Sequence, residues 1–279
     1  MIPAAFDYVA PNTVDEALAA LAQSGDDAKV LGGGQSLLPV LRMRLNAPEK
    51  VVDLSRIESL RGISEDADAL VIGAMTTHHE VANSELVRTH AAVLAEAAST
   101  VADPQIRHRG TLGGALVHAD PAGDLGAPIL ALDAELVVVG PGGERRIPAG
   151  EFFVDLFQTA VGDDELLTAI RIPKHTGWGG AYEKFVRVSH QWSIVAVAAV
   201  VDSSGDRRSA KVGLTNMGST PLRAPATEAA LAEGASVAEA AARAAEGTNP
   251  PSDLNGDSEY RAHLATVLTR RALERAMGG

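Results

Sequence analysis

Two glycine-rich segments contain the residues whose types and spacing could do chemistry. Gly32-Gly33-Gly34-Gln35-Ser36 follows a short apolar segment, and Gly110-Thr111-Leu112-Gly113-Gly114 combines the same small residues with a hydroxyl. Glycine allows another group to approach the backbone closely, and successive N–H groups in such a segment can converge on a phosphate. Each segment alone also fits a tight turn. The pair, each with an added side-chain donor, predicts a diphosphate held between two lobes.

The first segment differs from the common nucleotide-binding motifs. Its order of strand, glycines, apolar segment and strand, with Asp53 near the ribose-binding position, resembles a dinucleotide-binding fingerprint. However, Leu37 stands at the third glycine position and Pro39 falls where the phosphate-binding helix should settle. No Gly-Lys-Ser/Thr of a P-loop is present, and residues 34–38 lack the final glycine of a nucleophile elbow.

The histidines and the acid near these segments allow more than one interpretation. His78 and His79 are adjacent on an expected helix, so their side chains point about 100° apart and fit solvated helix-start residues better than a metal site. His108 and His118 flank the second segment as polar loop residues or cofactor contacts. Asp124 fits a ribityl or ribose contact as well as the N-cap of a helix over 125–132. We expect no metal site and no catalytic acid or base.

Composition narrows the possible functions. Among 279 residues, 24 Lys and Arg face 36 Asp and Glu, a net charge of −12 that disfavours nucleic acid and anionic membrane surfaces. The absence of Cys excludes disulfides, iron–sulfur ligation, Cys-based zinc sites and a thiol nucleophile, so a redox role needs an organic cofactor. The N-terminus lacks the features of a secretion signal, and no apolar run approaches about 20 residues. We expect a cytoplasmic protein without a membrane span.

Local patterns predict the elements that position these segments. Capping boxes begin helices at Thr13, Thr77 and Ser236. Strands are expected at 29–31, 50–54, 70–73 and 166–172, a hairpin at 135–147, an Ala-rich helix at 91–101, a loop over 102–114 and a last helix at 259–277. Segments 181–188, 193–202 and 208–216 predict an antiparallel meander after a linker at 176–180. The fold class is therefore α+β in three parts, 1–55, 56–175 and 176–279.

Three motifs in this order resemble a known family. Residues 31–39, 106–114 and 118–124 are similar to the FAD-binding medium subunit of molybdenum hydroxylases, a family that includes carbon monoxide dehydrogenase and has related FAD domains in xanthine dehydrogenase. The resemblance runs from Phe6 to the final helix. It implies a two-lobed FAD-binding domain of the PCMH type, with FAD between the first two parts, followed by a C-terminal domain with a three-stranded antiparallel sheet and helices.

The resemblance also implies roles for individual residues. The residues expected to clasp the FAD diphosphate are Gly32, Gly33, Gly34, Gln35, Ser36, Thr111, Leu112, Gly113 and Gly114, and Ala115 is a further expected FAD-binding residue. Asp124 matches an acid that fixes the polar chain of the flavin, Lys184 a lysine near the flavin, and Trp192 an aromatic residue near the isoalloxazine. The chain departs from the family where Gly32 replaces Ala, Ala115 replaces Asn or Ser, and residues 191–193 replace Asp-Tyr-Ala. Trp192 fits a core residue equally well.

The function that the resemblance implies is electron transfer. Electrons would pass from a molybdopterin centre on a large subunit, through a small subunit with two iron–sulfur clusters, to FAD on this chain and then to an external acceptor. The complex is expected to be a dimer of heterotrimers, and the lack of Cys fits clusters held by another chain. The alternatives are a free-standing FAD-dependent oxidase or reductase, for which no convincing base is seen, and a nucleotide-binding or assembly module.

Overall fold

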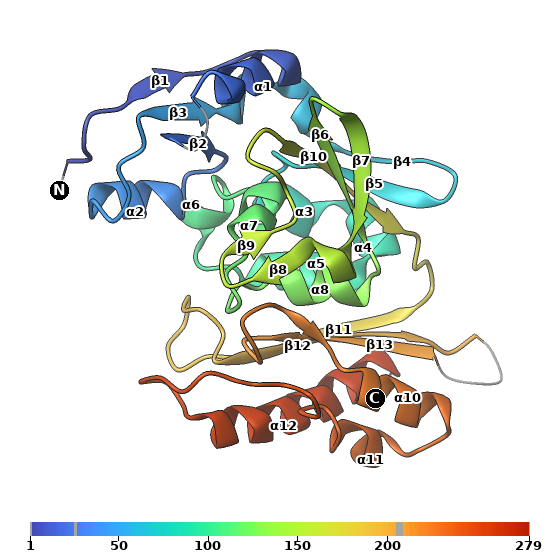
Figure 1. Cartoon of the computed structure of the whole chain (residues 1–279). Helices are drawn as coiled ribbons and strands as arrows, with labels where there is room; N and C mark the ends of the chain where they lie inside the picture. The colour runs from blue at the N-terminus through green and yellow to red at the C-terminus, as the bar shows by residue number, and fades with distance from the viewer. Residues whose placement is uncertain (1, 25–26, 205–208, 279) are drawn as a thin grey trace.

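Three larger β-sheets follow one another along the chain, and a small hairpin is inserted before the last strand of the second sheet (Figure 1). The structure is a computed structural model that describes residues 2–24, 27–204 and 209–278. Helices and strands are mixed in each part, which confirms the α+β class. Within the described residues, no helix is both long enough and apolar enough to cross a bilayer.

The first sheet is parallel and holds the first glycine segment at its edge. Its strands are β1 (Asp7–Val9), β2 (Ala28–Leu31) and β3 (Lys50–Asp53), in the order β1-β3-β2. Helix α1 (Val14–Ala22) begins as predicted, because the Thr13 side chain accepts a hydrogen bond from the Glu16 N–H at 3.1 Å. Helix α2 (Leu37–Arg42) follows the glycines directly. The segment from β2 to α2 is therefore anchored at both ends.

The second sheet has five strands and is central to the molecule. Strands β4 (Ile63–Glu65), β5 (Ala69–Gly73), β6 (Glu135–Gly140), β7 (Gly143–Pro148) and β10 (Leu166–Pro173) pair antiparallel in the order β4-β5-β10-β6-β7. The smaller elements of this part are α3 (His78–Asn83), α4 (Glu85–His90), α5 (Ala92–Thr100), α8 (Gly126–Ala131), α9 (Ala149–Phe152), β8 (Phe153–Asp155) and β9 (Gln158–Thr159). The strand that comes last in the sequence lies in the middle of the sheet.

The loop predicted over 102–114 is wrong in part, because it contains two helix starts. Helix α6 (Pro104–Arg107) is capped by Asp103, and α7 (Leu112–His118) is capped by Thr111, whose side chain accepts from the Gly114 N–H. Both helices carry the expected start signals, an Asp before Pro and a Thr N-cap. The high glycine content of the second segment conceals α7, because glycine lowers intrinsic helix propensity.

The third sheet lies between the helices of the second part and the last helix of the chain (Figure 1). Strands β11 (Gly179–Phe185), β12 (Val195–Asp202) and β13 (Ser209–Thr215) form the predicted meander, and the two-residue strand β14 (Leu222–Arg223) extends it to four. Arg208, the expected first residue of the third strand, lies outside the described residues. The remaining helices are α10 (Pro225–Ala232), α11 (Val237–Ala241) and α12 (Ser258–Ala276).

Strand β12 joins two hydrophobic cores. Ala196, Ala198 and Val200 pack into the core of the second part, whereas Val197 and Val201 on the other face pack into the core that includes α12. A strand that is buried on both faces has no polar alternation, which explains the unbroken apolar run in its sequence. The C-terminal part is thereby attached to the second part through a packed face.

Candidate functional site

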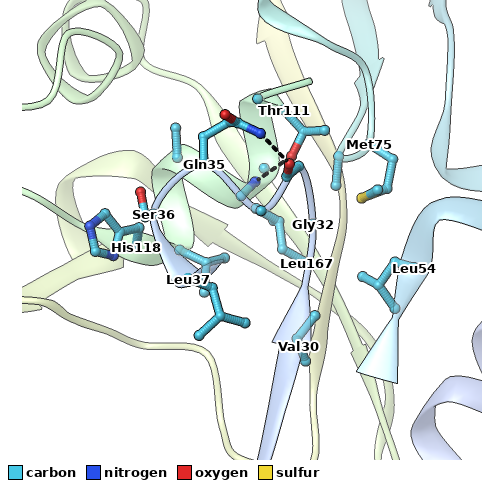
Figure 2. A pocket seen from close by; sticks show the side chains of 18 of the residues that line it. Val30, Gly32, Gln35, Ser36, Leu37, Leu54, Met75, Thr111, His118 and Leu167 are labelled. Atoms are coloured by element: carbon cyan, nitrogen blue, oxygen red, sulfur yellow. Dashed lines mark hydrogen bonds between the residues drawn. The ribbon is translucent and has the colours of Figure 1, made fainter. Parts of the chain in front are cut away.

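A cavity of about 470 Å³ lies where the two glycine segments meet. Figure 2 shows the loop from Gly32 to Leu37 facing Thr111, with His118 on one side and Met75 on the other. Apolar residues from both lobes, including Val30, Leu54 and Leu167, complete the lining. The volume falls within the range of about 300 to 1,000 Å³ that is usual for small-molecule and cofactor pockets.

The two glycine segments touch each other through their backbones. A Cβ on Gly33 would lie 2.1 Å from the Arg109 carbonyl oxygen and 2.6 Å from the Gly110 Cα, so no side chain fits at that position. Gly34 adopts φ +79°, a conformation that favours glycine. Close packing thus requires glycine at position 33, and the positive φ favours glycine at position 34.

The first segment presents backbone donors that the protein itself does not use. Within the described residues, no hydrogen-bond acceptor is found for the amide N–H groups of Gly33, Gly34, Gln35 and Ser36, and the Ser36 hydroxyl makes no cap hydrogen bond to α2. The Gln35 side chain is held in place by its Nε2, which donates to the Gly33 oxygen at 2.8 Å. Because unsatisfied amides are costly when they are removed from water, this run of donors suits an anionic ligand.

The second segment contributes differently from what its composition suggests. The N–H groups of Leu112 and Gly113 donate to Thr76 O and Ala74 O at 2.9 and 2.8 Å, and the Gly114 N–H donates to Thr111 Oγ1 at 3.2 Å. These amides are therefore engaged within the fold. What the segment offers to the cavity is the Thr111 hydroxyl and a surface without side chains at Gly113 and Gly114.

Four of the expected cofactor residues, Leu112, Asp124, Lys184 and Trp192, do not line this cavity in the structure. Leu112 is fully buried in the core beneath it, and Asp124 forms a buried ion pair with Lys184, whose Nζ lies 2.8 Å from Asp124 Oδ2. Tyr182 and Ser193 donate to the other carboxylate oxygen at 2.8 and 2.9 Å. Burial raises the pKa of Asp124, and the Lys184 ammonium opposes this shift.

The alternative roles considered for Asp124 and Trp192 are corrected by the structure. Asp124 is not a helix N-cap, because Leu125 occupies the N-cap position of α8 and the carboxylate is fully used by residues of the C-terminal part. Trp192 is not a core residue, because 67% of its surface is exposed in the connection between β11 and β12. It also does not line the cavity.

The histidines that line the cavity differ from those that the sequence analysis favoured. His78 is buried and lines the cavity, although it was expected to be a solvated helix-start residue. His118 also lines the cavity, whereas His108 stacks on His79 with ring centroids 4.0 Å apart. The spacing of His78, Val81 and Ala82, which are all buried on α3, was the available signal that His78 faces inward.

The one carboxylate that lines the cavity is paired. Glu165 accepts from Arg145 Nε at 2.7 Å, and this guanidinium holds the pKa of the carboxyl below its usual value. Phe157 and Val161, which sequence reasoning did not identify, complete the wall near His118. Within the described part of the chain, the cavity lining thus combines neutral donors, apolar side chains, the cationic Lys29 and an acid that is paired with Arg145.

Comparison with known proteins gives matches over almost the whole chain. Residues 4–175 match the family described as the FAD binding domain in molybdopterin dehydrogenase, and residues 180–276 match the CO dehydrogenase flavoprotein C-terminal domain. The carbon monoxide dehydrogenase medium chain of Hydrogenophaga pseudoflava is 40% identical over 99% of this chain and 98% of its own length. The 6-hydroxypseudooxynicotine dehydrogenase complex subunit alpha of Paenarthrobacter nicotinovorans is 36% identical over 99% and 96%.

A solved structure shares the fold. The chain from carbon monoxide dehydrogenase of Hydrogenophaga pseudoflava, in a form that lacks the Mo-pyranopterin moiety of the molybdenum cofactor, superposes with a TM-score of 0.96 and 42% identity, covering 99% of each chain. This match confirms the PCMH-type FAD-binding fold followed by a C-terminal domain. The chain is an oxidoreductase subunit that belongs to the family of FAD-binding medium subunits of molybdopterin-dependent dehydrogenases.

Proposed function

We propose that this chain carries electrons through FAD, from iron–sulfur clusters on a small partner subunit to an external acceptor. The electrons would originate at a molybdopterin centre on a large subunit. The observation that carries this proposal is the run of four unpaired amides, Gly33 to Ser36, at the edge of a cavity between two lobes. It is supported by the family match over residues 4–175.

The chain's own residues fit the diphosphate of FAD. The amides from Gly33 to Ser36 would donate to the phosphate oxygens, and the Ser36 and Thr111 hydroxyls would add two further donors. Gly32, Gly113, Gly114 and Ala115 line the same wall and leave room for the ligand. When bound, FAD supplies the ability to accept electrons and to release them singly or in pairs. No charged side chain has to be buried against the diphosphate.

Asp124, Lys184 and Trp192 act at the flavin end in this proposal. Asp124 and Lys184 would support the flavin end indirectly, because their buried ion pair joins the C-terminal sheet to the FAD-binding part while the carboxylate is engaged within the protein. Trp192 is exposed and available to shield the ring. No residue of this chain acts as a catalytic acid or base, because its task is to hold and orient the cofactor.

The proposed assembly places the metal chemistry elsewhere. The chain has no Cys, so thiolate ligands for iron–sulfur clusters have to come from a partner. We propose a complex with a large and a small subunit, arranged as a dimer of heterotrimers, in which the large subunit determines the oxidised substrate. The three-part domain division and the cytoplasmic location remain predictions from the sequence.

The test is flavin and metal analysis of the purified complex, followed by reduction with substrate. We expect stoichiometric FAD on this chain, and flavin bleaching by substrate only when the small subunit is present. A complex that contains molybdenum and iron but no FAD would contradict the proposal. Turnover of a substrate by the isolated chain would instead favour the free-standing oxidase or reductase.

A further inference from the structure

His78 lies directly beneath the contact between the two glycine segments. It is the first residue of α3, only 4% of its surface is exposed, and its backbone N–H donates to the Gly110 oxygen at 3.0 Å. A Cβ on Gly110 would lie 2.8 Å from both Cδ2 and Nε2 of the imidazole. The ring is therefore pressed against Gly110, and Gly110 in turn lies against Gly33.

The hydrogen-bonding capacity of this ring is unused. Nδ1 is enclosed by the protein and has no partner, and no described residue forms a hydrogen bond with Nε2. Because His78 lines the cavity while Nδ1 is enclosed, the ring edge that carries Nε2 is the one that reaches the cavity. A buried polar group without a partner is costly, so such a ring indicates a ligand that completes its hydrogen bonding.

The protonation state of the ring follows from its surroundings. Burial, followed by the charge of Arg107, lowers the pKa of His78 to about 4, so the imidazole is neutral near pH 7 and carries a single N–H. With no acceptor near Nδ1, the proton is best placed on Nε2. The nearby guanidinium of Arg107 is anchored by its Nη1, which donates to the Val101 and Ala102 oxygens.

We propose that His78 is a further FAD-binding residue, whose Nε2–H donates a hydrogen bond to an oxygen of the diphosphate. The inference rests on the proposed function, because it places FAD in the cavity between the glycine segments. The diphosphate that would accept from the amides of Gly33 to Ser36 would then also accept from the imidazole, which lines the same cavity. A neutral ring serves here better than a cation, because burying a charge is far more costly than burying a neutral donor.

Three substitutions distinguish the hydrogen bond that His78 would donate from the packing of its ring. His78→Gln keeps an N–H donor close to the position of Nε2, His78→Asn places the donor close to Nδ1, and His78→Phe keeps a ring of similar size without a donor. The complex that contains the full-length chain is purified, freed of flavin and titrated with FAD. We expect about 10- to 100-fold weaker FAD binding for His78→Phe and His78→Asn, and most of the affinity retained by His78→Gln.

Titration with ADP tests whether the diphosphate is the part of FAD that accepts the hydrogen bond from His78. The affinity for ADP, which carries the same diphosphate, should fall by the same factor as the affinity for FAD in His78→Phe, whereas the affinity for riboflavin should not change. Equal FAD binding by wild type and His78→Phe overturns the inference, as do equal losses in the Gln and Phe variants. If His78→Phe fails to fold, the inference still requires His78→Gln to bind more tightly than His78→Asn.

The same titration separates this inference from the proposed function. If the wild-type protein does not bind FAD, the proposed function fails. If the wild type binds FAD and the His78 variants bind it equally well, only the role of His78 is wrong. The melting temperatures of the flavin-free variants provide the control for the fold, because a purely structural role would lower them without the selective recovery in His78→Gln.

Discussion

Lys184 and Asp124 form a buried ion pair that connects the C-terminal sheet to the FAD-binding part, with Lys184 Nζ 2.8 Å from Asp124 Oδ2. The side chains are only 9% and 8% exposed, and Lys184 also donates to the Thr100 oxygen. An ion pair removed from water in this way persists only if its remaining hydrogen bonds are satisfied, as they are by Tyr182 and Ser193. The pair therefore links the C-terminal sheet to the part of the chain that contains Asp124.

Removal of one partner from this pair should strongly destabilise the fold. Lys184→Met leaves the Asp124 charge buried without its cation, and we expect a loss of about 3 kcal/mol in the free energy of unfolding, measured with urea. In Asp124→Asn/Lys184→Met, part of this loss should be recovered. Arg243→Ala, which breaks an exposed pair with Glu246, is the control and should leave the midpoint unchanged. If Lys184→Met and Arg243→Ala change the unfolding midpoint by the same amount, the buried pair contributes no more to stability than the exposed pair.

Substitution of Gly33 should prevent flavin binding. In Gly33→Val the new side chain meets the Arg109 oxygen, so the two glycine segments have to separate and the amide donors lose their arrangement. We expect the purified variant to lack FAD while the circular dichroism of the C-terminal helices is kept. Gly142→Ala, where a Cβ has no neighbour within 4 Å, is the matched control. Full flavin content in Gly33→Val would rule out the clasp.

The buried His78 should make stability depend on pH. The unfolded chain binds a proton at this histidine below about pH 6.5, but the folded chain does so only below about pH 4. Stability of the flavin-free protein should therefore fall as the pH decreases from 6.5 to 4, with about 3 kcal/mol from this group. In His78→Gln this part of the dependence should disappear, which urea unfolding at several pH values would reveal. Parallel curves for both proteins would contradict the prediction.

Trp192 should report flavin binding without affecting stability. The chain has two Trp, and Trp192 is 67% exposed, so Trp192→Phe should change the free energy of unfolding by less than about 0.5 kcal/mol. If Trp192 lies near the flavin, FAD should quench its fluorescence, and this quenching should be lost in Trp192→Phe but kept in Trp178→Phe. If the quenching is lost in Trp178→Phe and kept in Trp192→Phe, Trp192 does not lie near the flavin.

Local signals in the sequence predict many of the elements correctly. The capping boxes at Thr77 and Ser236 are both formed, and the unbroken apolar run of β12 corresponds to a strand buried on both faces. These signals work because a cap or a hydrophobic period is decided by residues that are neighbours in the sequence. Each glycine segment could be recognised in the same way, because its composition is local, and the prediction that the two hold one ligand comes from the likeness of the two compositions.

The remaining features depend on partners that are distant in the sequence. Asp124 could not be assigned to Lys184, because 60 residues separate them and nothing local fixes their approach. In the second glycine segment, the amides are consumed by Ala74 and Thr76, which the composition of the segment does not reveal. His78 and His79 are indistinguishable by type, and what separates them is that His78 shares a buried face of α3 with Val81 and Ala82.

The central position of β10 determines when the protein can acquire its cofactor during synthesis. Leu166 and Leu167 of this strand line the cavity, and Leu166 also completes the core of the first part together with Met75. The cavity therefore cannot close until residues 166–173 have left the ribosome and inserted between β5 and β6. Pairing over such a long sequence separation is slow. We therefore expect flavin loading to follow the insertion of this strand.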